Sequence, residues 1–119
     1  MTILGIDPGT RRIGYGIVRK DGSDVRFVEA GILEIVGVDD ISALAETKKG
    51  IDTLKKKHRP DALAIEKLYF AKNQKTALAV AQARGVILLS ACEHDIPVRE
   101  YAPNAKILFD SVSYRQTSQ

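Results

Sequence analysis

Two carboxylates stand where apolar segments end, and they are the residues of this chain best suited to chemistry. Asp7 closes a short apolar run near the start of the chain, and Glu66 closes a second run. Pro8 and Gly9 follow Asp7 and predict a type II turn, because proline fixes φ and glycine accepts positive φ. Carboxylate oxygens are ligands that Mg²⁺ prefers. The pattern favours a divalent-cation site where two strands end; an ordinary turn aspartate and a solvated strand-end glutamate are the alternatives.

The elements that must position these carboxylates follow from the apolar spacing. Extended patterns predict strands over residues 2–7, 13–20, 25–35, 61–66 and 98–101, and helical spacing predicts helices over 41–58 and 73–93. Three strands joined by tight turns, followed by alternating helices and strands, predict an α/β fold with a mixed five-stranded sheet flanked by helices. In such a sheet the first and fourth strands can be parallel neighbours. Asp7 and Glu66 would then lie at one sheet edge.

The second predicted helix carries a stripe of small residues. Ala77, Ala81 and Gly85 follow one another at helical spacing, and the stripe continues to Leu88 and Cys92. A glycine inside a helix costs about 1 kcal/mol relative to alanine, so a close approach of another backbone is expected there. Packing on the chain's own sheet and a symmetric contact with a second copy are the two interpretations. Cys92 is expected to be an inert buried thiol.

Composition limits the class of protein without choosing a function. The 119 residues predict one domain, and the net charge of +3 is compatible with a phosphate-bearing partner but does not require one. One cysteine excludes an intrachain disulfide, and no Cys/His spacing indicates zinc. The chain shows neither a signal-peptide pattern nor a fully apolar run of membrane-spanning length, so a cytoplasmic protein is expected. The basic residues 55–59 are interpreted as charges at a helix C-terminus, with a nucleic-acid contact as the alternative.

Six short motifs occur in an order and spacing that resembles the RuvC-type Holliday-junction resolvases. They are Asp7-Pro8-Gly9, Gly14-Tyr15-Gly16, Ala64-Ile65-Glu66, Ala71-Lys72-Asn73, Gln82-Ala83-Arg84-Gly85 and Glu100-Tyr101-Ala102-Pro103-Asn104. The resemblance covers residues 1–106 and implies an RNase H-like nuclease domain there, with a divergent segment over 107–119. It also implies a homodimer, through the helix with Ala77, Ala81 and Gly85, that cuts four-way DNA junctions with two Mg²⁺ ions per site. A branch-migration motor complex is implied as a further partner.

The resemblance assigns roles to individual residues. Asp7 and Glu66 match the first two of four acidic metal ligands, and Tyr69 matches an aromatic residue that contacts junction bases. DNA contacts are expected from Lys72 and Asn73, which match the family's pattern, and from the neighbouring basic residues Arg11, Arg12, Lys67 and Lys75. The family's third and fourth acidic residues lie beyond the position of residue 119. We therefore expect weak metal binding and reduced cleavage from this chain.

Three alternatives to the nuclease are considered. The first is a non-catalytic module that binds DNA junctions. The second is an RNase H-like relative of the YqgF type that acts in RNA processing, which shares the first strand and turn but does not account for Glu66 followed by Ala71-Lys72-Asn73. The third is a phosphate loop of the sugar-kinase or actin-like kind, for which 119 residues are too few because that class closes two domains on ATP.

Overall fold

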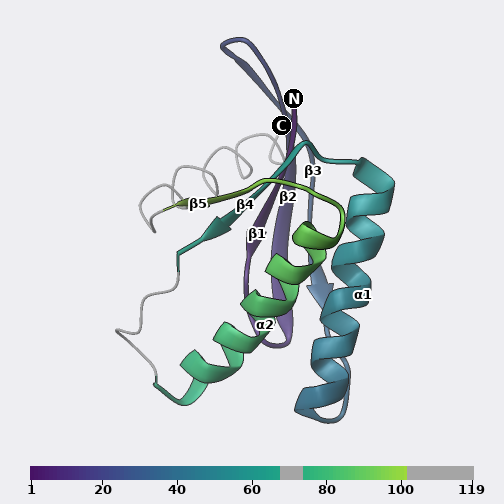
Figure 1. Ribbon diagram of the computed structural model, residues 1–119, viewed down its shortest axis with the longest axis vertical. Coiled ribbons are helices and arrows are strands. Elements are labelled where there is room, and N and C mark those ends of the chain that lie inside the picture. Colours follow the sequence, from purple (N-terminus) through teal and green to yellow (C-terminus); the bar gives the residue numbers. More distant parts are fainter. Residues whose placement is uncertain (68–73, 102–119) are drawn as a thin grey trace.

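The computed structural model describes residues 1–67 and 74–101, with the side chains of residues 74 and 75 left aside (Figure 1). It contains β1 (Thr2–Asp7), β2 (Arg12–Asp21), β3 (Asp24–Glu34), α1 (Asp40–His58), β4 (Ala62–Glu66), α2 (Gln74–Glu93) and β5 (Val98–Tyr101). All seven predicted elements are present, and each end lies within one residue of its predicted position. The divergent segment predicted over 107–119 lies outside the described residues.

The strands form one mixed five-stranded sheet in the order β3-β2-β1-β4-β5, which confirms the predicted fold class. The first three strands are antiparallel, whereas β4 is parallel to both β1 and β5. The pairing of β2 with β3 shifts register between Ile17 and Val18. Because β1 lies between β2 and β4, the strand that carries Asp7 is central, and its neighbour carries Glu66.

One face of the sheet is covered by both helices (Figure 1). Leu4 and Ile6 of β1 are fully buried and lie in register with Leu63 and Ile65 of β4. The same core contains Ile51 of α1, and it continues through Ile13, Ile17, Ile35, Ala43, Leu54, Ile87 and Ala91. Side chains alternate along a strand, so the residues between these apolar positions point to the opposite face. That alternation decides where the two carboxylates lie.

The start of α1 is fixed by an N-cap at Asp39. Asp39 has extended backbone angles, and its side chain accepts a hydrogen bond of 2.7 Å from the backbone N–H of Ser42. That bond lowers the pKa of Asp39 below its usual value, because it stabilises the ionised carboxylate. At the other end, Arg59 adopts the left-handed conformation before Pro60. The cap and this stop set the length of α1.

A buried polar cluster joins α1 to α2, and Lys55 lies at its centre. Lys55 belongs to the basic last turn of α1, as predicted, but it is only 5% exposed. Its Nζ donates to the carbonyl of Ser90, lies 2.5 Å from Nδ1 of His94, and lies 3.3 Å from Oδ1 of Asp52. Burial alone would raise the pKa of Asp52, but hydrogen bonds from Lys48, Ser90 and Lys55 outweigh it and lower the pKa to about 2. Both helices therefore meet through satisfied charges as well as apolar contacts.

Candidate metal centre and nucleic-acid surface

The strand register places Asp7 and Glu66 side by side. Ile6 pairs with Ile65 across the parallel strands β1 and β4, and each carboxylate is the next residue of its strand. Ile6 and Ile65 point into the core beneath the helices. By alternation, Asp7 and Glu66 point to the other face, where the two strands reach their carboxyl ends. Both residues are half-buried.

Two glycines near Asp7 each stand where the chain approaches another segment closely. Gly14 lies opposite Asp7 in β2, and a Cβ built there would come within 3.5 Å of the Asp7 Cβ. Gly9 is needed for a reason that differs from the predicted one. The described glycine with positive φ is Gly22, so Gly9 does not form the predicted type II turn; instead, a Cβ at Gly9 would lie 2.3 Å from the carbonyl oxygen of Arg12. The chain passes too close to itself there for any side chain.

The end of β4 is tied to two neighbouring elements. The N–H of Lys67 donates to the carbonyl of Tyr101 in β5 at 2.9 Å. From α2, Nε of Arg84 donates to the carbonyl of Glu66 at 3.3 Å. Nη2 of the same guanidinium lies 2.5 Å from Oε2 of Glu100. The end of β4 at Glu66 is thus held through its main chain by both α2 and β5.

Tyr101 lies on the face of the sheet that carries the carboxylates. It pairs in register with Glu66, and its hydroxyl donates to the carbonyl of Ile6 at 3.4 Å. The side chain therefore spans from β5 across β4 to β1. Tyr101 and Arg84 each lie within a motif that resembles the family, but the sequence alone assigned neither residue a role. Their place in those motifs was the signal that could have identified them.

The predicted DNA-contacting residues fall into three groups. Tyr69, Lys72 and Asn73 lie outside the described residues, as does the side chain of Lys75. Arg11 is engaged within the chain, because it donates to the carbonyl of Gly37 at 2.5 Å and pairs with Asp40 at 3.6 Å. The exposed residues Arg12 and Lys67 lie near the carboxylate edge.

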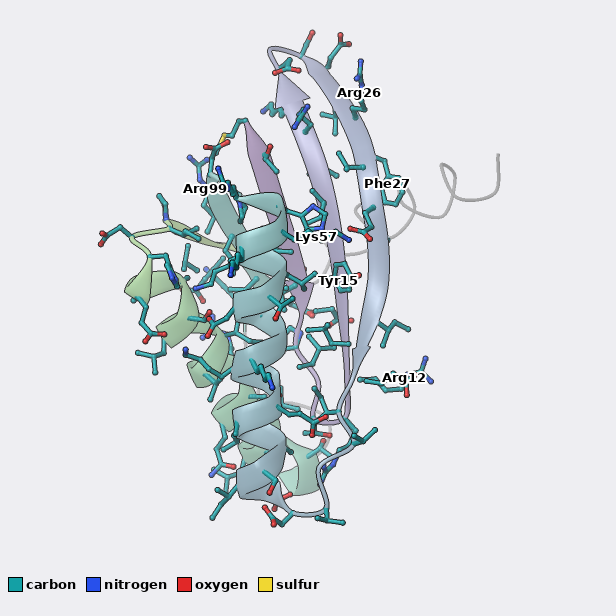
Figure 2. All side chains as sticks on the ribbon, turned by 90° about the vertical axis from the view of Figure 1, so that its right-hand side faces the viewer. Arg12, Tyr15, Arg26, Phe27, Lys57 and Arg99 are labelled. Carbon is teal, nitrogen blue, oxygen red and sulfur yellow. The ribbon has the colours of Figure 1, made fainter. Side chains whose placement is uncertain are left out.

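Arg12 begins β2, two residues before the glycine that faces Asp7. Its guanidinium makes one long ion pair of 3.9 Å with Glu34, and both side chains are about two-thirds exposed. Figure 2 shows Arg12 projecting away from the helices at this end of the sheet. A pair so exposed is weak, so Arg12 can exchange Glu34 for a phosphate.

The outer side of α2 is apolar. Leu78 and Leu89 are 71% and 55% exposed, whereas Ala83, Ile87 and Ala91 face the core. The 18-residue segment Thr76–Glu93 is long and apolar enough to cross a membrane, judged by length and composition only. Of this segment, 22% is buried inside the fold. A core helix that covers a sheet passes the same test, and the inner side of α2 packs in this way.

One expectation about α2 is wrong, and one of the two interpretations of its small residues is excluded. Cys92 is exposed rather than buried. Gly85 does not pack on the chain's own sheet, because a Cβ there would meet nothing within 4 Å in the described part of the chain. The reason is angular: at 100° per residue, position 85 lies about 200° around the helix from the buried positions 83 and 87. The contact with a second copy remains as the interpretation of Gly85.

Comparison with known proteins decides the family. Residues 3–108 match the family model described as "Crossover junction endodeoxyribonuclease RuvC". The chain belongs to the RuvC family. A RuvC of Moorella thermoacetica is 48% identical over 104 residues, which cover 87% of this chain and 62% of that protein. A RuvC of Chloroflexus aggregans is 43% identical over 106 residues, which cover 88% of this chain and 65% of that protein.

A solved structure supports the same assignment. "T. thermophilus RuvC in complex with Holliday junction substrate" matches with a TM-score of 0.77 and 26% identity, and the match covers 87% of this chain and 66% of that one. The RNase H-like fold expected from the sequence is thereby confirmed. The chain spans less than two thirds of the length of the RuvC relatives named above.

The RuvC match includes both carboxylates, and these fit a hard cation in kind. They are acidic, they share one face at adjacent strand ends, and Gly14 leaves open the side of Asp7 that a side chain would cover. In residues 1–67 and 74–101, however, no three His, Cys, Asp or Glu side chains gather closely enough to hold a metal. Within the described part of the chain, Asp7 and Glu66 are thus two candidate ligands rather than a complete set.

Proposed function

We propose that this chain is a structure-selective DNA endonuclease domain that acts on four-way junctions in recombination and repair. One observation carries the proposal: in a chain of the RuvC family, Asp7 and Glu66 share a face at the carboxyl ends of adjacent parallel strands. Carboxylates so placed can hold Mg²⁺ against a phosphate of the DNA backbone. The family match favours this proposal over the RNA-processing and phosphate-loop alternatives.

The proposed chemistry divides between the metal and the chain. The resemblance to the family implies two Mg²⁺ ions. These would shield the charge of the phosphate and make hydroxide available near neutral pH. Asp7 lies on the central strand and would hold both ions, while Glu66 would hold one. The glycine opposite Asp7 leaves room on one side of the carboxylate, and the tethers on Glu66 fix the other ligand.

The proposed DNA contacts lie around this edge. Arg12 and Lys67 are exposed and would bind backbone phosphates, as would Lys72, Asn73 and Lys75. Arg11 is proposed with a smaller share, because its guanidinium already holds Gly37 and Asp40. Tyr69 would stack on an unpaired base of the junction. A stacked base is worth about 1–3 kcal/mol, so the aromatic residue would favour branched over paired DNA.

Junction binding gives the direct test of this proposal. In Ca²⁺, the chain should bind a four-way junction more tightly than a duplex of the same arm sequence, measured by fluorescence anisotropy. In Mg²⁺, the junction should be cut and the duplex left intact. Tyr69→Ala should weaken junction binding by about 1–3 kcal/mol and leave duplex binding unchanged. Equal affinity for junction and duplex would contradict the proposal.

A non-catalytic junction-binding module is the second candidate function. The observation in its favour is that the described residues bring together two metal-ligating side chains rather than a larger set. The same assay separates the two functions. Tight junction binding in Ca²⁺ without any cleavage in Mg²⁺ would support the module, whereas cleavage at the junction would support the nuclease.

A second copy of the chain is proposed as a partner, bound through the outer side of α2. Leu78, Gly85 and Leu89 are exposed there, and a glycine without a neighbour allows another helix to approach closely. Ala77 and Ala81 are half-buried and would lie along the edge of this contact. The branch-migration motor complex and a cytoplasmic location are proposed on the resemblance to the family.

Gly85→Leu should separate the two protomers. Within one chain the new side chain meets open space and improves helix propensity, so the fold should be kept. Between two chains it would force the helices apart. Sedimentation at tens of micromolar should show a dimer for the wild type and a monomer for the variant. Lys49→Leu, which adds an exposed leucine to α1, is the control and should remain dimeric. A dimeric Gly85→Leu variant would refute this interface.

A further inference from the structure

We infer that Arg84 is a positioning residue for the metal ligand Glu66, and that it links the proposed dimer helix to the metal site. The inference deepens the proposed function and rests on it. Arg84 belongs to α2, whereas Glu66 ends β4 and Glu100 belongs to β5. One guanidinium contacts both acidic residues, the first through its carbonyl and the second through its carboxylate.

Arg84 acts on the main chain at the end of β4. The register of β1 with β4 runs to Ile65, and Glu66 is the next residue and the last of the strand. On the β5 side, the following N–H of Lys67 donates to Tyr101. The carbonyl of Glu66 turns to α2 instead and accepts from Nε of Arg84. Arg84 thus fixes the last peptide before the chain leaves the sheet.

Arg84 is itself held in one orientation. Its side chain is 15% exposed, and Nη2 lies 2.5 Å from Oε2 of Glu100, whose side chain is 48% exposed. A hydrogen bond between a guanidinium and a carboxylate is stronger than one between neutral groups. The planar guanidinium presents its donors in a fixed fork, so orienting one edge on Glu100 also aims Nε at the Glu66 carbonyl.

The consequence concerns the geometry of the two carboxylates. Asp7 is fixed by a central strand, but the position of the Glu66 carboxylate depends on where the end of β4 lies. A site with few ligands gains affinity from ligands held at the correct spacing, and displacements of about 1 Å can cost two orders of magnitude in catalysis. Arg84 contributes by holding that spacing from the side of the sheet opposite the metal.

Binding of Mn²⁺ to the full chain, measured by electron paramagnetic resonance without DNA, tests the inference. Arg84→Met removes both hydrogen bonds at similar volume and should weaken Mn²⁺ binding at least fivefold. Arg84→Lys keeps the charge but loses the fork, and should recover part of the loss. Glu100→Gln should weaken Mn²⁺ binding about twofold, because Arg84 still donates to the Glu66 carbonyl and loses only the charge of the residue that orients it. Arg26→Ala removes an exposed arginine from the far end of the β2–β3 hairpin and should bind as wild type (Figure 2).

Thermal unfolding of each variant accompanies the binding measurement. Wild-type Mn²⁺ affinity in Arg84→Met would overturn the inference, and so would an equal loss in Arg26→Ala. If the wild type and Arg84→Met bind both junctions and Mn²⁺ equally well, the positioning role is overturned and the proposed function stands. A wild-type chain without any Mn²⁺ affinity would overturn the proposed metal site and this inference with it.

Discussion

Asp7→Asn should reduce Mg²⁺-dependent cleavage of a four-way junction by on the order of 10³-fold or more. Asparagine has the size and shape of aspartate but lacks its charge, so the central strand would lose its ligand for a divalent cation. Metal contacts to the reacting phosphate are worth several kcal/mol, and each 1.36 kcal/mol changes the rate tenfold. The measurement is a single-turnover cleavage assay on a labelled junction.

The matched control for this prediction is Asp24→Asn, which neutralises an exposed carboxylate at the other end of the sheet. It should cut as the wild type does. Asp7→Asn should still bind the junction in Ca²⁺ with an affinity within a few-fold of the wild-type affinity, because phosphate contacts supply most of the binding free energy. Cleavage by Asp7→Asn at more than a tenth of the wild-type rate would remove Asp7 from the site.

Lys55→Met should lower the free energy of unfolding by about 3 kcal/mol, because it removes the buried ammonium that contacts Ser90, His94 and Asp52, and a hydrogen bond with a charged group contributes about 1.5–3 kcal/mol. The substitution would leave the Ser90 carbonyl without its lysine donor and Asp52 with Lys48 and Ser90 alone. Urea denaturation at neutral pH provides the measurement. Lys56→Met, an exposed neighbour on the same helix, should change stability by less than about 0.5 kcal/mol. A loss below about 1 kcal/mol in Lys55→Met would show that the cluster contributes little.

Local signals were enough to predict the elements of this fold. The Asp39 cap, the stop at Pro60 and the tight turn at Gly22 each act within a few residues, so the sequence shows them directly. The two terminal carboxylates were also visible, because a charge that ends an apolar run has no packing use. Their juxtaposition required one further step, the parallel pairing of β1 with β4.

Contacts between distant segments account for what the sequence did not show. Lys55 is four residues from the end of a basic run and looks solvated, yet α2 covers it and provides the Ser90 carbonyl. The orientation of α2 was not evident because the helix is apolar on more than one side. The sequence drew attention to the small residues around Gly85, whereas Ala83 and Ile87 face the core. The tether from Arg84 to Glu66 joins a side chain to a carbonyl, and no residue pattern encodes such a bond.

The position of β3 has a consequence for solubility. Within the described residues this strand pairs with β2 alone, so it forms an edge of the sheet that is eleven residues long. Val25, Val28 and Ile32 are each about half exposed on it. A long apolar edge of this kind can add a strand from another molecule and so lead to aggregation. The exposed charges of Asp24, Arg26 and Glu34 interrupt the strand, and the register shift in β2–β3 disturbs its regularity. Such charges oppose edge-to-edge growth, and neutralising them would favour it.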